Sequence, residues 1–394
     1  MGVTVDVRGR VITALTDARA RTMDLLDPIG DADLVRQVSP LMSPLVWDLA
    51  HVGHYEELWL LRNITGAPPT DERFDDIYDA FKHPRRDRPS LPILGPAEAR
   101  AFVGVVRSRV LDVLASADLH GDDRLLRAGF VYGMVVQHEH QHDETMLATI
   151  QLMDDFAHPD AADWRPGAVD AEPGMVAIDA GPFLMGADDA WAYDNERPRH
   201  EVELASFRID RNPVTNAEYR AFVEDGGYDD PRLWGAAGWA WRHESGADAP
   251  QFWSREGGGD WSRRRYGRRE ELPAHEPVQH VSWHEADAFA RWRGARLPSE
   301  AEWEKAASME GEQGGPRRML GGVWEWTGTD FDGYPGFAPF PYREYSEVFF
   351  GPEYKVLRGG SWATDPSVRR ATFRNWDYPI RRQIFAGLRC AADA

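Results

Sequence analysis

The sequence is poor in cysteine, with Cys390 as the only one among 394 residues. A single thiol excludes an internal disulfide and a multi-thiolate metal site, so a reducing cytoplasm is the expected compartment. Long apolar runs are also missing, because no stretch approaches the roughly 18–20 residues that cross a bilayer. The opening segment "MGVTVDVRGRVITALTDARART" lacks the apolar core of a secretory signal and the hydroxyl residue of a myristoylation site. We therefore expect a cytoplasmic protein without a membrane partner.

Positive charge is scarce relative to negative charge. The chain has 45 lysines and arginines against 65 aspartates and glutamates, so its formal net charge is −20 at pH 7. This charge repels a phosphate backbone and argues against nucleic acid as a partner. Tryptophan, by contrast, is plentiful, with 16 residues that cluster in the second half. We expect a monomer whose partners are small molecules.

The two halves of the chain differ in pattern. Residues 1–157 carry apolar side chains at helical spacing, which predicts an antiparallel four-helix bundle. Residues 158–174 are polar, contain proline and glycine, and indicate a linker. Residues 175–394 alternate short β-type runs with turns and show clear helices only near 216 and 284. The predicted fold class is therefore α+β multidomain. The four helices are expected near 10–26, 44–64, 97–118 and 122–155.

The second predicted helix has a start signal and is followed by a long loop. In "SPLVWDLAHVGHYEELWLLRN", Ser43 is the expected N-cap and Pro44 occupies the first turn. The loop "AFKHPRRDRPSLPILGP" is rich in proline and arginine and is longer than the roughly 2–8 residues that usually connect bundle helices. Long ordered loops are often functional, so this one is a candidate binding segment.

The stretch "QHEHQHDE" at 137–144 combines histidines with acids. At about 100° per residue, His138 and His142 fall on one helix face, whereas His140 points elsewhere. Glu144 also faces away from this pair, which makes it a poor third ligand. A histidine pair at i, i+4 is the spacing that lets two imidazoles reach one cation. Two ligands do not make a site, so a third must come from another helix.

The third ligand can come from "WDLAHVGHYEELW". His51 and His54 lie three residues apart on roughly one helix face, and a bundle brings its helices side by side. The alternative is that both are packed core histidines. The residues alone leave open which of the two would meet His138 and His142.

The second half carries a series of motifs that complete the pattern. They are "GPFLMG" (181–186), "HEVELASFRIDRNPVTNAEYRAFVEDGGY" (200–228), "PVQHVSWHEADAFARW" (277–292), "RLPSEAEWEKAA" (296–307), "GGVWEWT" (321–327), "LRGGSW" (357–362) and "FRNWDYPIRRQIFAGLR" (373–389). With the histidine pattern of the first half, the chain resembles the ergothioneine-biosynthesis sulfoxide synthases of the mycobacterial type over nearly its whole length. The resemblance implies a DinB-like four-helix bundle followed by a formylglycine-generating-enzyme-like domain of C-type lectin fold.

The resemblance also implies a metal centre. It places the ligands of Fe(2+) on His51, His138 and His142 and leaves Glu144 outside the coordination sphere. Three histidines leave three positions open on an octahedral ion, enough for a thiolate, an imidazole nitrogen and O2. The sequence does not fix the metal, since imidazoles also accept zinc, nickel and copper.

The implied substrates are hercynine (trimethylhistidine) and γ-glutamylcysteine. Gln141, Asn375 and Tyr345 would hold or adjoin hercynine in this resemblance. Asp377 and Arg381 would bind the amino-acid end of γ-glutamylcysteine. Arg85 and Arg88 in "HPRRDRP" would contact its other carboxylate, since forked guanidiniums suit carboxylates, and Arg86 competes for this role. The alternatives are a solvated helix position for Gln141 and ordinary surface arginines in the loop.

A tyrosine is the implied proton donor. Joining carbon to sulfur, rather than merely oxidising the thiol, needs an acid placed at the oxygen chemistry, and a phenol stays protonated until it is used. The stretch "YPGFAPFPYREYSEVFF" offers Tyr334, Tyr342 and Tyr345. The resemblance assigns the acid to Tyr342. The alternative is that all three are packing residues of an aromatic loop.

The expected reaction is the iron-dependent joining of hercynine to γ-glutamylcysteine with O2, giving a sulfoxide. Three rivals remain: the same chemistry with cysteine or a selenium donor, a DinB-type thiol transferase that uses another divalent metal, and a lectin-like binding protein with a structural metal. Cys390 alone cannot form the two-cysteine copper site of true formylglycine-generating enzymes. A calcium site is doubtful because Gly322 removes a polar side chain from "GGVWEWT". The tryptophans Trp283, Trp303, Trp324, Trp326 and Trp362 are expected in the core.

Overall fold

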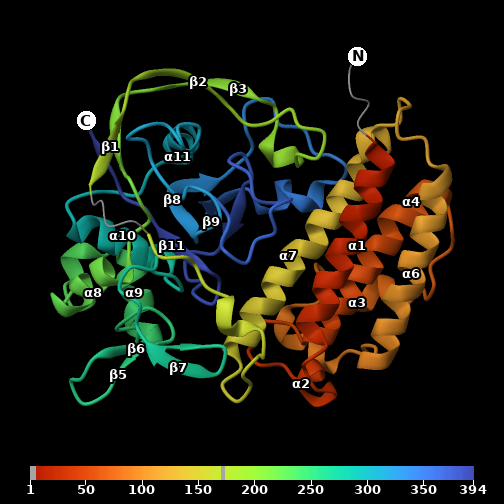
Figure 1. The fold of residues 1–394 in the computed structure, drawn as a ribbon, viewed down its shortest axis with the longest axis horizontal. Helices are drawn as coiled ribbons and strands as arrows, with labels where there is room; N and C mark the ends of the chain where they lie inside the picture. The colour runs from red at the N-terminus through yellow and green to blue at the C-terminus, as the bar shows by residue number, and fades with distance from the viewer. Residues whose placement is uncertain (1–5, 170–173) are drawn as a thin grey trace. The chain divides into compact units, whose positions relative to one another are not determined.

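The computed structural model describes residues 6–169 and 174–394, in two compact units, Met1–Pro159 and Asp160–Ala394 (Figure 1). Residues 160–169, expected in a linker, are therefore counted with the second unit. Residues 1–5 of the opening segment and residues 170–173 of the expected linker lie outside the described residues. Among the described helices, none is long and apolar enough to span a membrane.

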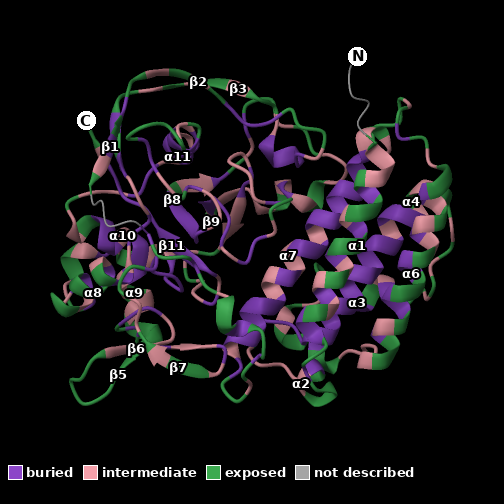
Figure 2. Cartoon of the chain, viewed as in Figure 1, coloured by how far each residue is buried: buried purple, intermediate pink, exposed green. Residues whose placement is uncertain are grey.

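The first unit is a bundle of long helices. Apolar residues at helical spacing bury one face of the first helix, as with Val11, Leu15 and Ala18. Buried and exposed residues alternate around α1 and α6 (Figure 2). The long helices are α1 (Val7–Leu26), α3 (Leu45–Glu56), α6 (Pro96–Ser116) and α7 (Phe130–Leu152). Short helices connect them: α2 (Asp31–Val35), α4 (Asn63–Thr65), α5 (Phe74–Ile77), and the 3₁₀ turns η2 (Arg85–Ser90) and η3 (Arg127–Gly129).

Helix α3 is buried along its whole length. Every residue from Leu45 to Glu56 is buried, and the chain continues directly into a π-helical segment, η1 (Glu57–Arg62). A helix that is buried all round belongs to the centre of a structure. The predicted N-cap is wrong: α3 starts after Pro44 without a side-chain cap, because the Ser43 hydroxyl accepts a hydrogen bond from Arg88 Nη1 at 2.6 Å.

A closed ring of four charges joins the four long helices. Each helix contributes one member: Arg19 from α1, Glu56 from α3, Arg107 from α6 and Glu139 from α7. Each arginine contacts both glutamates, with N–O distances of 2.8 Å and 2.6 Å for Arg19 and 2.5 Å and 2.8 Å for Arg107. Burial opposes ionisation of Glu139, but the two arginines outweigh it and lower the pKa of that carboxyl.

The second unit is built on four small sheets. A four-stranded sheet has the order β10-β9-β8-β11, in which β11 runs parallel to β8 and the other pairs are antiparallel. The other sheets are β1-β4-β12, β5-β6-β7 and β2-β3, all antiparallel. The strands are β1 (Met175–Ile178), β2 (Gly181–Met185), β3 (His200–Leu204), β4 (Phe207–Asp210), β5 (Trp253–Arg255), β6 (Trp261–Arg265), β7 (Arg268–Glu271), β8 (Trp324–Phe331), β9 (Gly351–Arg358), β10 (Asn375–Asp377), β11 (Ala386–Leu388) and β12 (Ala391–Asp393).

Four α-helices accompany these sheets, two more than the sequence pattern predicted. The predicted helices are α8 (Asn216–Glu224) and α10 (Trp283–Trp292), and the additional ones are α9 (Ala236–Ser245) and α11 (Glu300–Ala307). Helix α11 starts with a capping box in which Ser299 and Glu302 bond each other's backbone, a local signal that offsets its short length. The remaining turns are η4 (Ala161–Asp163), η5 (Asp194–Glu196), η6 (Pro231–Leu233), η7 (Arg343–Tyr345) and η8 (Glu347–Phe349).

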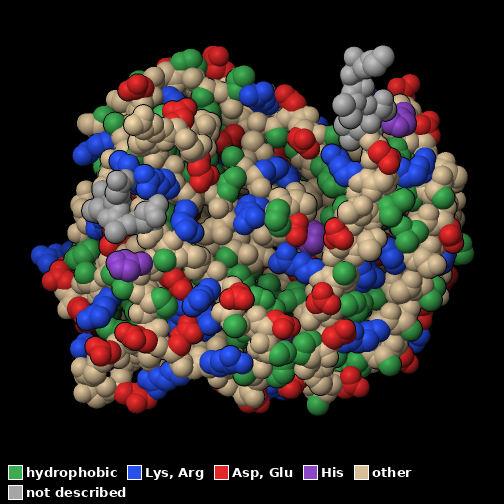
Figure 3. Space-filling view, viewed as in Figure 1, with side chains coloured by type: hydrophobic (Ala, Val, Ile, Leu, Met, Phe, Trp, Pro, Cys, Tyr) green, Lys and Arg blue, Asp and Glu red, His purple; other side chains and the backbone are tan. Residues whose placement is uncertain are grey.

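Tryptophans contribute to the core of the second unit, as expected, but not all five do so fully. Trp303 and Trp326 are completely buried and Trp324 nearly so, whereas Trp283 and Trp362 are half-buried. The buried indoles find hydrogen-bond partners: Trp303 Nε1 donates to Glu325 Oε2 at 2.7 Å and Trp326 Nε1 to the Val281 carbonyl at 2.9 Å. On the face drawn in Figure 3, acidic and basic side chains are interspersed.

Candidate metal centre

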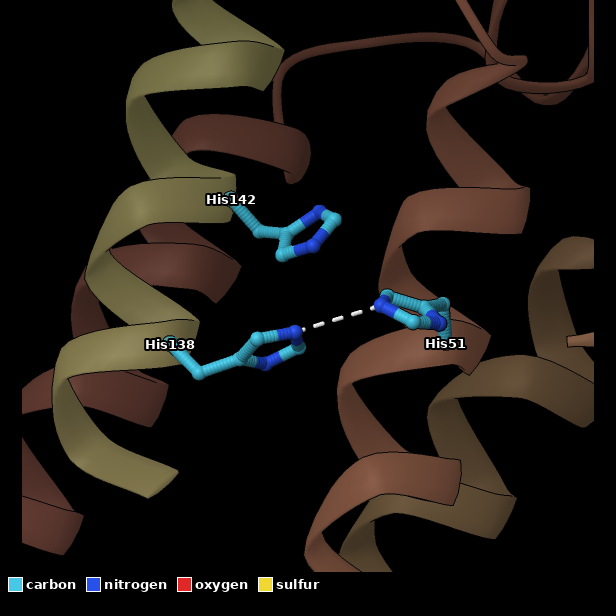
Figure 4. Close-up of side chains that lie close together, drawn as sticks. All are labelled: His51, His138 and His142. Carbon is cyan, nitrogen blue, oxygen red and sulfur yellow. Dashed lines mark hydrogen bonds between the residues drawn. The ribbon is translucent and has the colours of Figure 1, made fainter. Parts of the chain in front are cut away.

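Three histidines from two helices of the first unit converge on one point. His138 and His142 lie one turn apart on α7, and His51 faces them from α3 (Figure 4). One ligand atom from each ring can be chosen so that all lie within 4.8 Å of one another. His51 Nε2 and His138 Nε2 are 3.2 Å apart. The structure therefore selects His51 rather than His54 as the partner of the i, i+4 pair.

The environment keeps two of these rings uncharged. Burial, followed by the proximity of His142, lowers the pKa of His51 well below its ordinary value. The same causes, together with His51, lower the pKa of His138. Neutral imidazole is the form that offers a lone pair to a metal ion. His51 and His138 are therefore in the neutral form that can bind a metal ion at neutral pH.

Hydrogen bonds fix which nitrogen of two rings faces the centre. His51 Nδ1 lies 2.7 Å from the Tyr78 carbonyl oxygen, to which it donates. His142 Nδ1 lies 3.0 Å from Asp48 Oδ1 and donates to that carboxylate. Each bond leaves the Nε2 lone pair free to point toward the shared centre. His138 Nδ1 is buried and has no hydrogen-bond partner among the described residues.

Aromatic rings hold two of the imidazoles by stacking. Trp47 stacks on His51 with ring centroids 4.8 Å apart and planes inclined by 11°. Tyr55 stacks on His138 at 3.8 Å and 15°. Both aromatic residues come from α3, so this one helix supplies a ligand and the supports of two ligand rings. Such packing restricts the rotation of the rings before any ion arrives.

The other histidines near the centre are directed elsewhere. His54 Nε2 bonds Asp75 Oδ1 at 2.8 Å, and His140 Nδ1 bonds Asp143 Oδ2 at 3.1 Å. Glu144 is half-buried and does not belong to the convergent group. Glu139 and Asp143 therefore connect α7 to the rest of the bundle, while His138 and His142 face the centre.

The donor set fits a divalent transition metal. Three imidazole nitrogens carry no charge of their own and leave part of the coordination sphere open for other ligands. A purely structural site would usually supply four protein ligands. Across residues 6–169 and 174–394, no second group of three histidine, cysteine or carboxylate side chains converges in this way.

The predicted substrate-binding residues of the first unit differ in exposure. Arg88 is buried, lies over the Trp47 ring with its guanidinium carbon 3.6 Å from the centroid, and donates to Ser43 and to the carbonyls of Ala80 and His83. Burial lowers the pKa of Arg88 to about 10. Arg85, in contrast, is half-buried.

The other two arginines of the loop and Gln141 are partly or largely exposed. Arg85 Nη1 donates to the Leu41 carbonyl at 3.0 Å, and Arg86 is 73% exposed beside Asp87. Gln141 is half-buried on α7, next to His142. Of the arginines in the loop, Arg88 is thus the one fixed in the interior beside Trp47.

In the second unit, the predicted tyrosines lie in an aromatic cluster. Tyr345 stacks on Tyr193 at 4.1 Å and meets the edge of Trp376 at 5.8 Å, and Tyr342 lies 6.2 Å from Tyr345. Their loop is anchored on a buried acid, because Asp194 accepts from the Ser346 hydroxyl at 2.6 Å and from the Phe340 amide at 3.2 Å. The loop is therefore held at both ends of the tyrosine pair.

The remaining predicted residues lie on or just after β10. Asn375 and Asp377 are two residues apart in this strand, so they share one face, and Trp376 points to the other. Arg381 Nε lies 3.3 Å from Asp377 Oδ1. Arg381 Nη1 is buried and has no hydrogen-bond partner among the residues described. The carboxylate and the guanidinium thus form an ion pair next to β10.

Sequence reasoning missed the supports of the histidines. Asp48 is the one charged residue in the apolar run "LVWDLAHV", three positions before His51 and hence on nearly the same helix face. That isolated charge was a usable signal. Trp47 and Tyr55 gave none, because aromatic residues in a buried helix usually only fill the core.

Comparison with known proteins covers both units. The DinB superfamily matches residues 14–146, and the sulfatase-modifying factor enzyme 1-like domain matches residues 161–317 and 308–394. Formylglycine-generating enzyme of Streptomyces coelicolor is 34% identical over 56% of this chain and 90% of its own. These matches confirm the predicted fold class, a helical DinB unit followed by a lectin-like unit.

Full-length relatives carry both units in one chain. Hercynine oxygenase of Mycolicibacterium thermoresistibile is 46% identical over 100% of this chain and 96% of its own. The hercynine oxygenases of Mycolicibacterium smegmatis and Mycobacterium tuberculosis are each 45% identical, over 95% and 96% of this chain and 97% of their own. The chain therefore belongs to the hercynine oxygenase family.

Proposed function

We propose that this protein is a non-haem iron(II) oxygenase that joins hercynine to γ-glutamylcysteine, as expected for a hercynylcysteine sulfoxide synthase of ergothioneine biosynthesis. The observation that carries the proposal is the convergence of His51, His138 and His142, each oriented by its own support. The names of the full-length relatives supply the substrate class.

The proposed reaction balances with O2 as its only oxidant. The C2–H bond of the hercynine imidazole and the S–H bond of the thiol break, and a C–S bond forms. One oxygen atom ends on the sulfur as a sulfoxide, and the other leaves as water with the two hydrogens. Iron(II) would supply O2 binding and activation at the three histidines.

The chain's own residues would bind the two substrates and move one proton. In the first unit, Gln141 contacts hercynine, while Arg85 and Arg88 pair with a carboxylate of the thiol substrate. Arg88 suits this role because burial already destabilises its charge, so an incoming carboxylate would be bound strongly.

In the second unit, the proposal assigns hercynine contacts to Asn375 and Tyr345. Asp377 and Arg381 bind the ammonium and carboxylate of the γ-glutamyl end, which the buried, unsatisfied Arg381 Nη1 supports. Tyr342 donates the proton that directs the reaction to C–S bond formation rather than to oxidation of the thiol.

The decisive experiment is anaerobic Fe(II) loading followed by exposure to air with hercynine and a panel of thiols, with products identified by mass spectrometry. We expect a sulfoxide product from γ-glutamylcysteine, and oxygen consumption that requires both substrates. His138→Ala should abolish both iron binding and turnover. His54→Ala is the matched control, because His54 lies on the ligand-bearing helix but bonds Asp75. If His54→Ala lost as much iron binding and turnover as His138→Ala, the assignment of the ligands would be contradicted.

The same assay tests the substrate and proton roles. A buried charged contact is worth about 1.5–3 kcal/mol, so Asp377→Asn should weaken γ-glutamylcysteine by roughly ten- to a hundredfold. Tyr342→Phe should keep iron and substrates bound but divert turnover toward thiol oxidation. If the wild type used cysteine or a selenium donor as efficiently as γ-glutamylcysteine, the proposed specificity for γ-glutamylcysteine would be contradicted. The closely related reaction with that donor would then be favoured. Turnover without O2 would favour a thiol transferase.

A further inference from the structure

A buried carboxylate stands directly behind one of the three histidines. Asp48 of α3 is 1% exposed, and its Oδ1 accepts the hydrogen bond from His142 Nδ1 of α7 at 3.0 Å. Its other oxygen, Oδ2, is buried without a hydrogen-bond partner among the described residues. The Arg88 guanidinium interacts electrostatically with this carboxylate, but it donates its hydrogen bonds to Ser43 and to backbone carbonyls. Asp48 thus has one direct partner, a histidine.

The supports of the three histidines are unequal in charge. His51 is backed by the neutral carbonyl of Tyr78, and His138 is backed by the stacked ring of Tyr55 without a hydrogen bond at its Nδ1. His142 alone is backed by a carboxylate. A hydrogen bond from an imidazole to a carboxylate raises the donor strength of the opposite ring nitrogen.

A carboxylate with one neutral partner is costly to bury. Removing an ionised acid from water costs several kcal/mol unless opposite charge lies nearby. The three imidazoles offer no such charge as long as they are neutral, but a divalent ion on the far side of His142 would. A cation at the centre would therefore add to the attraction that Asp48 already receives from Arg88 and would help to offset the cost of burying the unpartnered Oδ2.

We propose that Asp48 is a positioning residue of the metal centre, which directs His142 Nε2 at the ion and supplies the one negative charge beside an uncharged donor set. This inference rests on the proposed function in that it requires the three histidines to bind a metal. Asp48 contributes this charge without occupying a coordination position. It leaves the open positions to substrates while lowering the net charge around the ion.

The test is metal affinity measured without turnover. Metal-free full-length protein is titrated anaerobically with Fe(II), and separately with Co(II), against a competing chelator. Loss of a carboxylate behind a ligating histidine typically costs about 10–100-fold in metal affinity, so we expect this loss for Asp48→Asn. Asp75→Asn is the matched control, since Asp75 bonds His54, a histidine of the same helix outside the centre. It should change the affinity by less than about twofold, because no ligand is affected.

The outcomes separate this inference from the proposed function. A folded Asp48→Asn variant that binds both ions as tightly as the wild type would overturn the role of Asp48 and leave the iron assignment intact. A wild-type chain that binds neither ion would overturn both.

A second measurement needs no variant. In metal-free wild-type protein with ¹⁵N-labelled histidine, His142 should show the tautomer protonated at Nδ1, with that proton hydrogen-bonded to a carboxylate. A His142 ring protonated at Nε2 would contradict the proposal, whether or not Asp48→Asn folds.

Discussion

Both units bury a glutamate completely, but the two glutamates have different surroundings. Glu139 in the bundle contacts two arginines, Arg19 and Arg107, within the ring of four charges. Glu325 in the second unit contacts one, Arg389, at 2.9 Å. Burial raises the pKa of Glu325 because the single arginine does not offset it, whereas the pKa of Glu139 is lowered. The number of cations around a buried acid decides whether its charge is favourable.

The two arrangements also connect different things. The ring in the bundle joins four helices, so each member holds the relative position of two or more of them. Arg389 instead donates to Glu325 and to the carbonyls of Asp210 and Arg317, and thereby ties neighbouring segments of a loop-rich unit together. The bundle depends on a shared network, and the second unit on bonds with several independent partners.

Breaking the ring should give the largest effect. Glu139→Gln leaves two buried guanidiniums facing the single carboxylate of Glu56, and removal of one partner of a buried ion network costs about 3–5 kcal/mol. Hydrogen exchange followed by mass spectrometry should show faster exchange in peptides of α1, α3, α6 and α7, and unchanged exchange in the second unit.

The exposed pair Asp27–Arg100 between α1 and α6 provides the control for this variant. Asp27→Asn should lower the free energy of unfolding by about 0.2–1 kcal/mol, the usual contribution of a surface ion pair. A Glu139→Gln variant that costs no more than this control would show that the ring is not what distinguishes the bundle.

An intermediate effect is expected from a buried histidine of the second unit. Burial lowers the pKa of His280 to about 3. Below pH 6.5 the unfolded chain takes up a proton that the folded chain refuses, so the free energy of unfolding falls with pH by up to about 1.4 kcal/mol per unit. This stability is fully present above pH 6.5 and is lost as the pH falls toward 3.

His280→Asn should flatten the pH dependence of the unfolding midpoint between pH 4 and 6.5. Asparagine is suitable because His280 has a φ of 65°, a left-handed conformation that asparagine tolerates. His243→Asn, at an exposed position on α9, is the control. Parallel curves for the wild type and His280→Asn would contradict the expectation.

The smallest effect is expected at Glu325. Glu325→Gln removes a charge whose burial is already unfavourable, and Arg389 keeps its backbone carbonyl partners. We expect the free energy of unfolding to fall by less than the roughly 3–5 kcal/mol that removing one partner of a buried ion pair usually costs, because the Arg389 guanidinium keeps its carbonyl partners. Urea unfolding followed by tryptophan fluorescence reports on this unit, because most tryptophans belong to it. If Glu325→Gln lowered the free energy of unfolding as much as Glu139→Gln does, the two glutamates would not differ in their contribution to stability.

Sequence periodicity was informative for long elements and weak for short ones. Helices α1, α3 and α6 begin within three residues of the positions that apolar spacing predicts. Helix α7 begins at Phe130 rather than near 122, because Arg127–Gly129 form a separate turn in which Ala128 has a φ of 56°. Helix α9, "AAGWAWRHES", was missed since it has a glycine and two tryptophans in place of an apolar stripe. The predicted N-cap at Ser43 failed because a distant arginine, Arg88, binds its hydroxyl.

The candidate site was predictable to the extent that its residues are close in sequence. The spacing of His138 and His142 pointed to a metal, and the family resemblance selected His51. The ring of four charges had no comparable signal, because its members come from four separate helices. Arg19 and Glu139, for example, are 120 positions apart. Such pairs become visible only once the helices are packed.

The ring has a consequence for the evolution of the bundle. Its two positive and two negative members balance, so an exchange of any single one for an apolar residue leaves a buried charge uncompensated. Replacing all four with apolar residues, by contrast, can be close to neutral, as for other buried ion networks. The intermediates are therefore disfavoured while both endpoints are viable. Among descendants of a common ancestor, positions 19, 56, 107 and 139 should change together or stay together, so that four helices far apart in the chain are inherited as one unit.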